Sequence, residues 1–200
     1  TSQWGYYHPT AGARVKFTTR QTAPVSPSSQ YYTEPILDAR KYIRITDRGS
    51  LAFRLTGGAS FGRDPQQFYL GGGDTLRGYP YYSLHGSRFG LASAELRFPV
   101  LDYLVFPIKG FALGGFRSLL FADLGSAWGD FDPSSPYYDK RPWHLNDEDA
   151  SYDRFTFASS EGGWHLVHAK MAFGTGIRWW LGYFDMRLDW AWPTNLRRVQ

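Results

Sequence analysis

The sequence predicts an all-β protein, an antiparallel transmembrane β-barrel with about seven visible strands. Seven segments alternate apolar and polar side chains with a period of two, which is typical of strands that have one apolar face. Tight turns and long polar loops largely alternate between them, as in outer-membrane barrels. Aromatic residues make up 18% of the 200 residues, and several stand at strand ends, where barrels carry an interfacial girdle. The seven segments are 13–20, 37–45, 51–61, 88–100, 117–128, 170–179 and 184–192.

Composition limits the chemistry that the chain can perform. The sequence has no cysteine, which excludes disulfides, thiolate metal sites and cysteine nucleophiles. The formal net charge of +4 is spread over loops and expected lumen positions, so a nucleic-acid-binding patch has little support. No stretch approaches the roughly 20 apolar residues of a transmembrane helix. This does not exclude a membrane barrel, because only one face of each barrel strand is apolar.

The first three strands differ in the quality of their alternation. In the first, Val15 and Phe17 alternate with a cationic face that includes Arg14 and Lys16. In the second the alternation is poorer, because Lys41 falls on the face of the two isoleucines near the strand end. The third follows the turn signal at 47–49 and has one apolar face and one small or polar face.

The fourth and fifth strands carry charge on one face only. The fourth places Glu95 and Arg97 opposite a face of alanine, leucine and phenylalanine, and Pro99 is expected to end it. The fifth is apolar apart from a single acid, Asp123, which shares a face with Phe121. The polar face of each strand therefore has the composition of a lumen wall.

The sixth and seventh strands show the clearest alternation. Arg178 and a series of glycines face away from the apolar residues of the sixth strand. Asp185, Arg187 and Asp189 face away from those of the seventh. A slip of one residue would carry Arg187 onto the apolar face, at roughly 2–4 kcal/mol if that face met lipid at the membrane midplane.

The connections also favour a barrel. The links at 47–49 and 181–182 are tight, whereas those at 21–32, 63–87 and 129–163 are long. Only the link at 101–113 departs from the alternation. A soluble β-sandwich would alternate too, but it would bury its apolar faces. The charged, glycine-rich second face and the aromatic strand ends favour the membrane barrel. These strand-end aromatics are Phe98, Trp128, Trp179, Trp180 and Trp192.

Residues 68–79, with the sequence FYLGGGDTLRGY, form the most unusual segment of the chain. It is not a phosphate-binding P-loop, because it lacks the terminal Gly-Lys-Ser/Thr and a strand-to-helix setting. Two interpretations remain, a mobile outer loop and a segment that folds back and packs. Three glycines followed by aromatics and one arginine favour the second.

Six segments, in order along the chain, resemble motifs of the bacterial surface antigen family, the BamA- and TamA-like assembly factors of outer membranes. The GGGDTLRGY segment resembles the Arg-Gly-Phe/Tyr loop of that family. The match runs from about Pro9 to Pro193 and so covers nearly the whole chain. The other five segments are HPTAGAR at 8–14, DARKY at 38–42, AELRFP at 94–99, FADLGSAW at 121–128 and GTGIRW at 174–179.

The resemblance implies that residues 1–200 are the C-terminal part of a sixteen-stranded barrel, with an inward-folding loop at about 63–87 and a long outer loop at about 129–163. The chain ends without the aromatic-ended last strand of the family, so we expect this part to hold the loop and the back wall. Both seam strands, where clients are thought to add, are expected to lie outside it.

The resemblance also implies that the loop arginine, Arg77, contacts an acid on the inner wall, and the matching acid is Asp123. The residues alone leave an alternative open, in which Arg77 is solvated and Asp123 pairs with Arg97 or Arg178. The loop-motif residues are Gly72, Gly73, Leu76, Arg77, Gly78 and Tyr79. Further lumen candidates are Glu95, Arg97, Arg178, Asp185 and Arg187.

No catalytic or metal site is expected. The carboxylates of 129–163 lack EF-hand spacing, so a solvated loop is favoured over a calcium site. His165 and His168, three apart near a strand, would lie on opposite faces rather than share a zinc ion. No Ser/His/Asp set or carboxylate pair stands out.

The function implied by the resemblance is non-enzymatic assembly, insertion or translocation of outer-membrane proteins, in the bacterial outer membrane and without a cofactor. The implied partners are the lipid bilayer, unfolded outer-membrane protein clients and accessory assembly subunits, with no nucleic acid. An alternative is a barrel that anchors or exports an upstream domain such as a lipase. A small autonomous adhesin or channel is disfavoured by the loop motif.

Overall fold

The computed structural model describes residues 11–105, 112–129, 157–160, 163–166, 169–181 and 184–195. Every element in this part of the chain is a strand, and all strand pairs are antiparallel. No helix in these ranges is long and apolar enough to cross a membrane. The predicted all-β antiparallel class is therefore confirmed.

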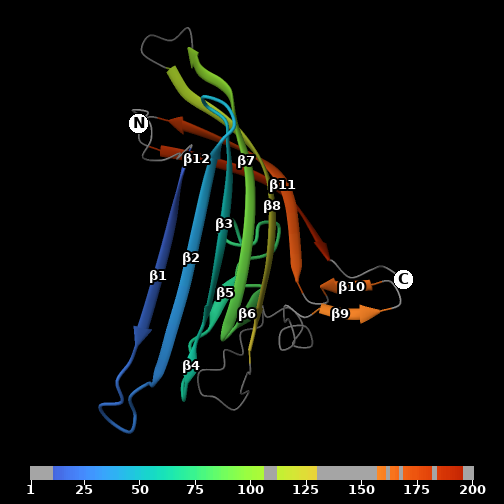
Figure 1. The fold of residues 1–200 in the computed structure, drawn as a ribbon. Coiled ribbons are helices and arrows are strands. Elements are labelled where there is room, and N and C mark those ends of the chain that lie inside the picture. Colours follow the sequence, from blue (N-terminus) through green and yellow to red (C-terminus); the bar gives the residue numbers. More distant parts are fainter. Residues whose placement is uncertain are drawn as a thin grey trace.

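One curved sheet of eight strands dominates the structure (Figure 1). Its order is β1-β2-β3-β7-β8-β11-β12, with β4 beside β2, so that β1 and β12 are its edges within the described residues. The sheet is open. The strands are β1 (Gly12–Gln21), β2 (Tyr32–Arg44), β3 (Ser50–Ala59), β4 (Phe61–Gly62), β7 (Arg88–Val105), β8 (Ala112–Trp128), β11 (Lys170–Leu181) and β12 (Phe184–Asn195).

Two small hairpins lie outside the main sheet. The first, β5 (Phe68–Leu70) with β6 (Leu84–Gly86), belongs to the long connection between β4 and β7. The second, β9 (Phe157–Ser160) with β10 (Gly163–Leu166), belongs to the connection between β8 and β11. Most of the acidic loop at 129–163 and the side chains of His165 and His168 lie outside the described residues.

β2 begins at Tyr32, earlier than the strand start expected at Leu37. Glu34 and Pro35 hide this strand in the sequence because they interrupt the apolar pattern. In the structure both residues pair with β1. Glu34 forms an ion pair with Arg20, in which Oε1 lies 3.5 Å from Nη1. The inward face of β2 therefore carries a second acid, Glu34, in addition to Asp38, with Ile36 between them.

Pro99 does not end its strand, contrary to the expectation from the sequence. β7 continues to Val105, and the register with β8 shifts between Pro99 and Leu101, which leaves Val100 as a β-bulge. A bulge is one of the few places where a strand tolerates a residue without an N–H group. Of the connection expected at 101–113, residues 101–105 and 112–113 belong to β7 and β8, where Val105 lies opposite Ala112.

The two faces of the sheet are opposite to those of a water-soluble protein. Large apolar side chains stand exposed on one face, as with Val15 at 71% and Leu55 at 59% of their full accessible surface. Buried apolar residues instead lie on the other face, where the loop between β4 and β7 packs against the wall. This core consists of Leu70, Leu76, Leu84, Leu91 and Ala127, with Tyr79 and Phe89 beside it.

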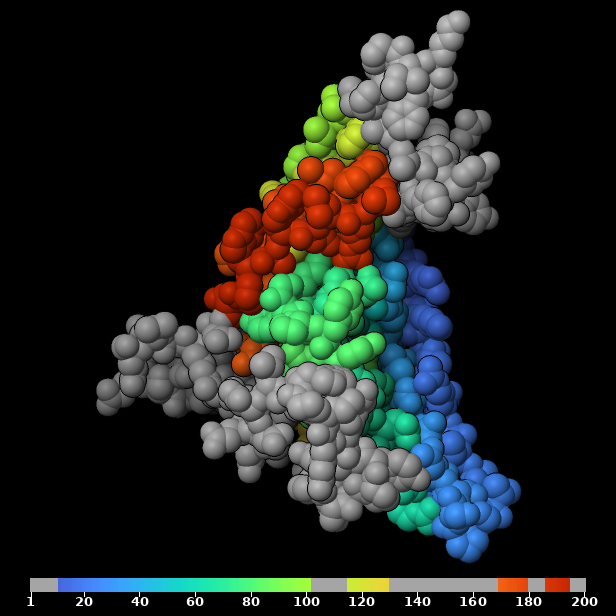
Figure 2. Space-filling view, turned by 180° about the vertical axis from the view of Figure 1, so that it is seen from behind, coloured from blue at the N-terminus to red at the C-terminus, as the bar shows by residue number. Residues whose placement is uncertain are grey.

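The loop fills the hollow of the sheet. Figure 2 shows the green segment that contains it between the red strands near the C-terminus and the blue strands near the N-terminus. The inner face of the sheet therefore positions the loop, and the outer face is free to meet lipid.

Candidate functional site

The loop turns back on itself through glycines whose backbone conformation excludes other residues. Gly71 has a φ of +113°, and a Cβ there would lie 2.1 Å from the carbonyl oxygen of Pro80. The Gly71 N–H donates to the Thr75 hydroxyl at 2.9 Å, and the Gly72 N–H donates to the Tyr79 carbonyl at 3.0 Å. These bonds form a compact tip that presents Arg77 to the wall.

Arg77 binds Asp123 of β8 through two parallel hydrogen bonds. Its Nε lies 2.6 Å from Oδ2 and its Nη2 lies 2.7 Å from Oδ1. The side chains are 5% and 0% exposed, so the pair is withdrawn from water. Planar bidentate pairing is the strongest geometry available to an arginine and a carboxylate.

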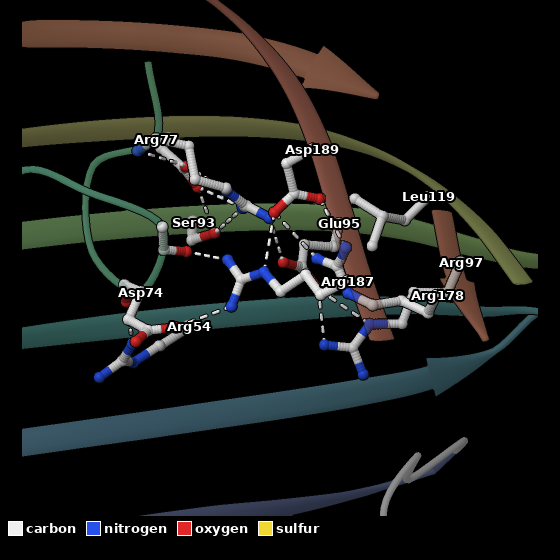
Figure 3. Close-up of polar contacts among 12 residues, drawn as sticks. Arg54, Asp74, Arg77, Ser93, Glu95, Arg97, Leu119, Arg178, Arg187 and Asp189 are labelled. Atoms are coloured by element: carbon white, nitrogen blue, oxygen red, sulfur yellow. Dashed lines mark hydrogen bonds and ion pairs between the residues drawn. The ribbon is translucent and has the colours of Figure 1, made fainter. Parts of the chain in front are cut away.

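Two more donors of Arg77 bind side chains of β7. Nη1 donates to Glu95 Oε1 at 2.7 Å, and Nη2 donates to the Ser93 hydroxyl at 3.2 Å (Figure 3). The guanidinium also lies over the Phe121 ring, 3.7 Å from its centroid. Burial acts to lower the pKa of Arg77, but hydrogen bonds and charge from Asp123 and Glu95 outweigh it, so the pKa stands above its ordinary value.

The two other partners considered for Asp123 are engaged elsewhere. Arg97 donates to Glu95 Oε2 from Nε at 2.8 Å and from Nη2 at 2.5 Å. Arg178 donates to Asp189 through two bonds of 2.5 and 3.2 Å. The structure therefore brings Arg77, and neither of these arginines, to Asp123.

A second set of contacts holds the loop tip to β12. Arg187 donates from Nη1 to Asp74 Oδ1 at 2.7 Å, from Nη2 to the Gly73 carbonyl, and from Nε to Asp189 Oδ2 at 2.8 Å. Asp74 and Asp189 were not among the predicted site residues. The only sequence signal for Asp189 was its place on the same strand face as Arg187. The side chain of Asp185, a predicted lumen residue, lies outside the described part of the chain.

A third set of contacts reaches β3 and β11. Arg54 of β3 donates to the Asp74 carbonyl at 3.3 Å. The Tyr79 hydroxyl lies 3.2 Å from the carbonyl oxygens of both Met171 and Thr194, which face each other across β11 and β12. The tip thus contacts β3 toward one edge of the sheet and β11 and β12 toward the other.

Two further motif residues contribute packing. The Leu76 side chain is fully buried in the core between loop and wall. Gly78 has a φ of +86° and lies against β12, where a Cβ would meet the Ala191 side chain at 3.1 Å. In the described residues no cluster of three or more His, Asp or Glu could hold a metal ion.

Comparisons with known proteins agree with this architecture. Residues 5–198 match the model of the Omp85 superfamily domain. A search of curated proteins found no match. Among solved structures, the chain is similar to a crystal structure of BamA from Haemophilus ducreyi lacking POTRA domains 1–3, with a TM-score of 0.64 and 18% sequence identity. The similarity covers 94% of this chain and 36% of that chain, so this chain spans about a third of the BamA structure. The chain therefore belongs to the Omp85 superfamily, and its open sheet is part of a β-barrel of the bacterial outer membrane.

Proposed function

We propose that this chain is the C-terminal barrel part of a non-enzymatic factor that assembles, inserts or translocates outer-membrane proteins. The observation that carries the proposal is the buried Arg77, which fixes the inward loop to Asp123 and Glu95 on neighbouring strands. Membership of the Omp85 superfamily supports the same role.

In this proposal the chain forms a part of the barrel wall that the inward loop holds rigid. Assembly of a barrel client requires strand pairing and local disturbance of the membrane, and it makes or breaks no covalent bond in the client. The arginine loop joins β3, β7, β8, β11 and β12, so it keeps this side of the barrel in one shape. The proposed partners are the lipid bilayer, unfolded outer-membrane protein clients and accessory assembly subunits.

Depletion of the full-length protein tests the proposal. We expect the amount of folded porin in the outer membrane to fall, and expression of the parent gene to restore it. An Asp123→Asn gene should restore it only in part. If porin levels stay constant while an upstream domain disappears from the cell surface, the barrel is an anchor or export channel and the proposal is wrong.

A further inference from the structure

Two rows of arginines run across the inner face of the sheet. The members of each row lie directly opposite one another in neighbouring strands. Like charges in this arrangement destabilise a sheet, so the fold alone gives no reason for them. The first row consists of Arg14, Arg40 and Arg54 on β1, β2 and β3, and the second of Arg117, Arg178 and Arg187 on β8, β11 and β12.

The aspartates that bind the two rows are shared between arginines. Asp38 accepts hydrogen bonds from Arg40 and Arg54, and Asp189 accepts them from Arg178 and Arg187. Each aspartate thus serves two guanidinium groups. On the first row, Arg40 and Arg54 thus share a single carboxylate, so this part of the inner face carries an excess of positive charge.

A cavity of about 360 Å³ lies between the rows. It extends from the loop tip at 73–75 to Arg48 and Ser50, beside the tight turn that joins β2 to β3. Eight arginines line it, and six of them share five carboxylates in or behind the lining, those of Asp38, Asp74, Glu95, Asp123 and Asp189, so arginine outnumbers carboxylate. The cavity is large enough for several residues of peptide side chain and backbone, and its field favours an anion.

The loop tip shows which chemistry the rows bind. Asp74 bridges them, because its carbonyl accepts from Arg54 of the first row and its carboxylate accepts from Arg187 of the second (Figure 3). Arg187 also binds the carbonyl of Gly73. The side chain of Asp74 is 87% exposed, so this acidic segment occupies the rim of the cavity and leaves its interior open.

We propose that the cavity binds an acidic peptide segment that enters from the turn end of the sheet, with its carboxylates and carbonyls on arginines of both rows. Asp74 and Gly73 are the internal precedent for this mode, since they use a carboxylate and two backbone carbonyls together. Phosphate oxygens also accept hydrogen bonds from arginine, so inorganic pyrophosphate is tested beside the peptide. The inference goes beyond the proposed function, because an anchoring barrel with the same lumen would bind the same peptide.

The test measures peptide binding to the full-length protein in detergent by fluorescence anisotropy. The probe is an eight-residue labelled peptide of alternating aspartate and serine, and the control peptide has asparagine in place of aspartate. We expect only the acidic peptide to bind, and its affinity to fall as salt rises. Arg40→Gln and Arg178→Gln, one from each row, should each weaken binding about tenfold. Arg63→Gln, whose exposed side chain lies at the start of the 63–87 loop and away from the cavity, should have no effect.

Asp74→Asn provides a test in the opposite direction. It removes the carboxylate that competes for Arg187, so the acidic peptide should bind about two- to fivefold more tightly. Because the side chain is exposed, this variant should fold even if a row variant does not. Equal binding of the asparagine peptide, unchanged binding by Asp74→Asn, or binding of inorganic pyrophosphate in place of the peptide would each overturn the proposal.

Discussion

The guanidinium of Arg77 donates four hydrogen bonds to the wall. Asp123 takes two of its N–H groups, while Glu95 and Ser93 on the adjacent strand take others. The Ser93 hydroxyl also donates to Asp123 at 2.5 Å, so the carboxylate is held from two sides. A buried charge with this many partners is stable as a set and unstable when one partner is removed.

Asp123→Asn should destabilise the folded barrel by about 3–5 kcal/mol, because the buried Arg77 loses the charge that balances it. The measurement is the free energy of unfolding from a denaturant titration in detergent micelles. Asp64→Asn is the matched control, since Asp64 also accepts from an arginine, but its partner Arg63 is exposed at the start of the 63–87 loop. Its effect should stay within about 1 kcal/mol. Equal effects of the two changes would contradict the buried pair.

Gly71→Ala should prevent the loop tip from closing. The new Cβ would lie 2.1 Å from a backbone oxygen, and the residue would have to keep a φ of +113°. We expect faster cleavage of the loop by added protease. Gly73→Ala is the control, because a Cβ there would make only ordinary contact with the Arg187 side chain, 3.5 Å away. If both variants are cleaved alike, backbone strain at Gly71 is not what shapes the tip.

At the level of elements, the strands were more predictable than their ends. The period-two pattern located all seven long strands, because a strand between lipid and lumen must alternate. It misplaced the start of β2 and the end of β7, where Pro35 and Pro99 remain within strands. Proline is read as a terminator because it lacks an N–H group, and the bulge at Val100 that accommodates Pro99 has no signature of its own.

The site was predictable only where a motif marked it. Residues alone left Asp123 with three candidate arginines, and the family resemblance selected Arg77. Asp74 and Asp189 carry no such mark, because their importance depends on where the folded loop tip meets β12. Contacts between a loop and a distant strand depend on register and curvature, and neither can be read from local pattern.

The apolar face of β3 provides a prediction for a whole strand. Leu55 lies near its middle and points outward with 59% of its surface exposed. In lipid, Leu55→Arg should reduce the free energy of folding into vesicles by roughly 2–4 kcal/mol. Leu55→Phe should change it little. A neutral effect of arginine would mean that this face meets water.

At the level of the molecule, the loop behaves as one docked body. Its buried Leu76 and its exposed Tyr81, 0% and 68% accessible, mark the inner and outer sides of the same segment. Since the chain has no cysteine, single cysteines report on docking without background. Leu76→Cys should resist maleimide labelling, and Tyr81→Cys should label quickly.

Combining Leu76→Cys with Asp123→Asn tests whether the buried pair controls docking. The labelling rate at position 76 should rise by at least about tenfold, because loss of about 3 kcal/mol shifts the population toward the undocked loop. Labelling of Tyr81→Cys should not change in the same background. An unchanged rate at position 76 would show that the other contacts suffice to hold the loop.

The connections of the loop tip also impose an order in time. Arg54 on β3 precedes the loop in the chain, whereas Asp123, Met171 and Arg187 follow it, the last by more than a hundred residues. The loop therefore leaves the ribosome long before most of its binding partners exist. Contacts so distant in sequence form late in folding. A docked loop is accordingly a record that β12 has been synthesised, inserted and placed in register, and a protease or chaperone that senses the undocked loop could distinguish an unfinished barrel from a finished one.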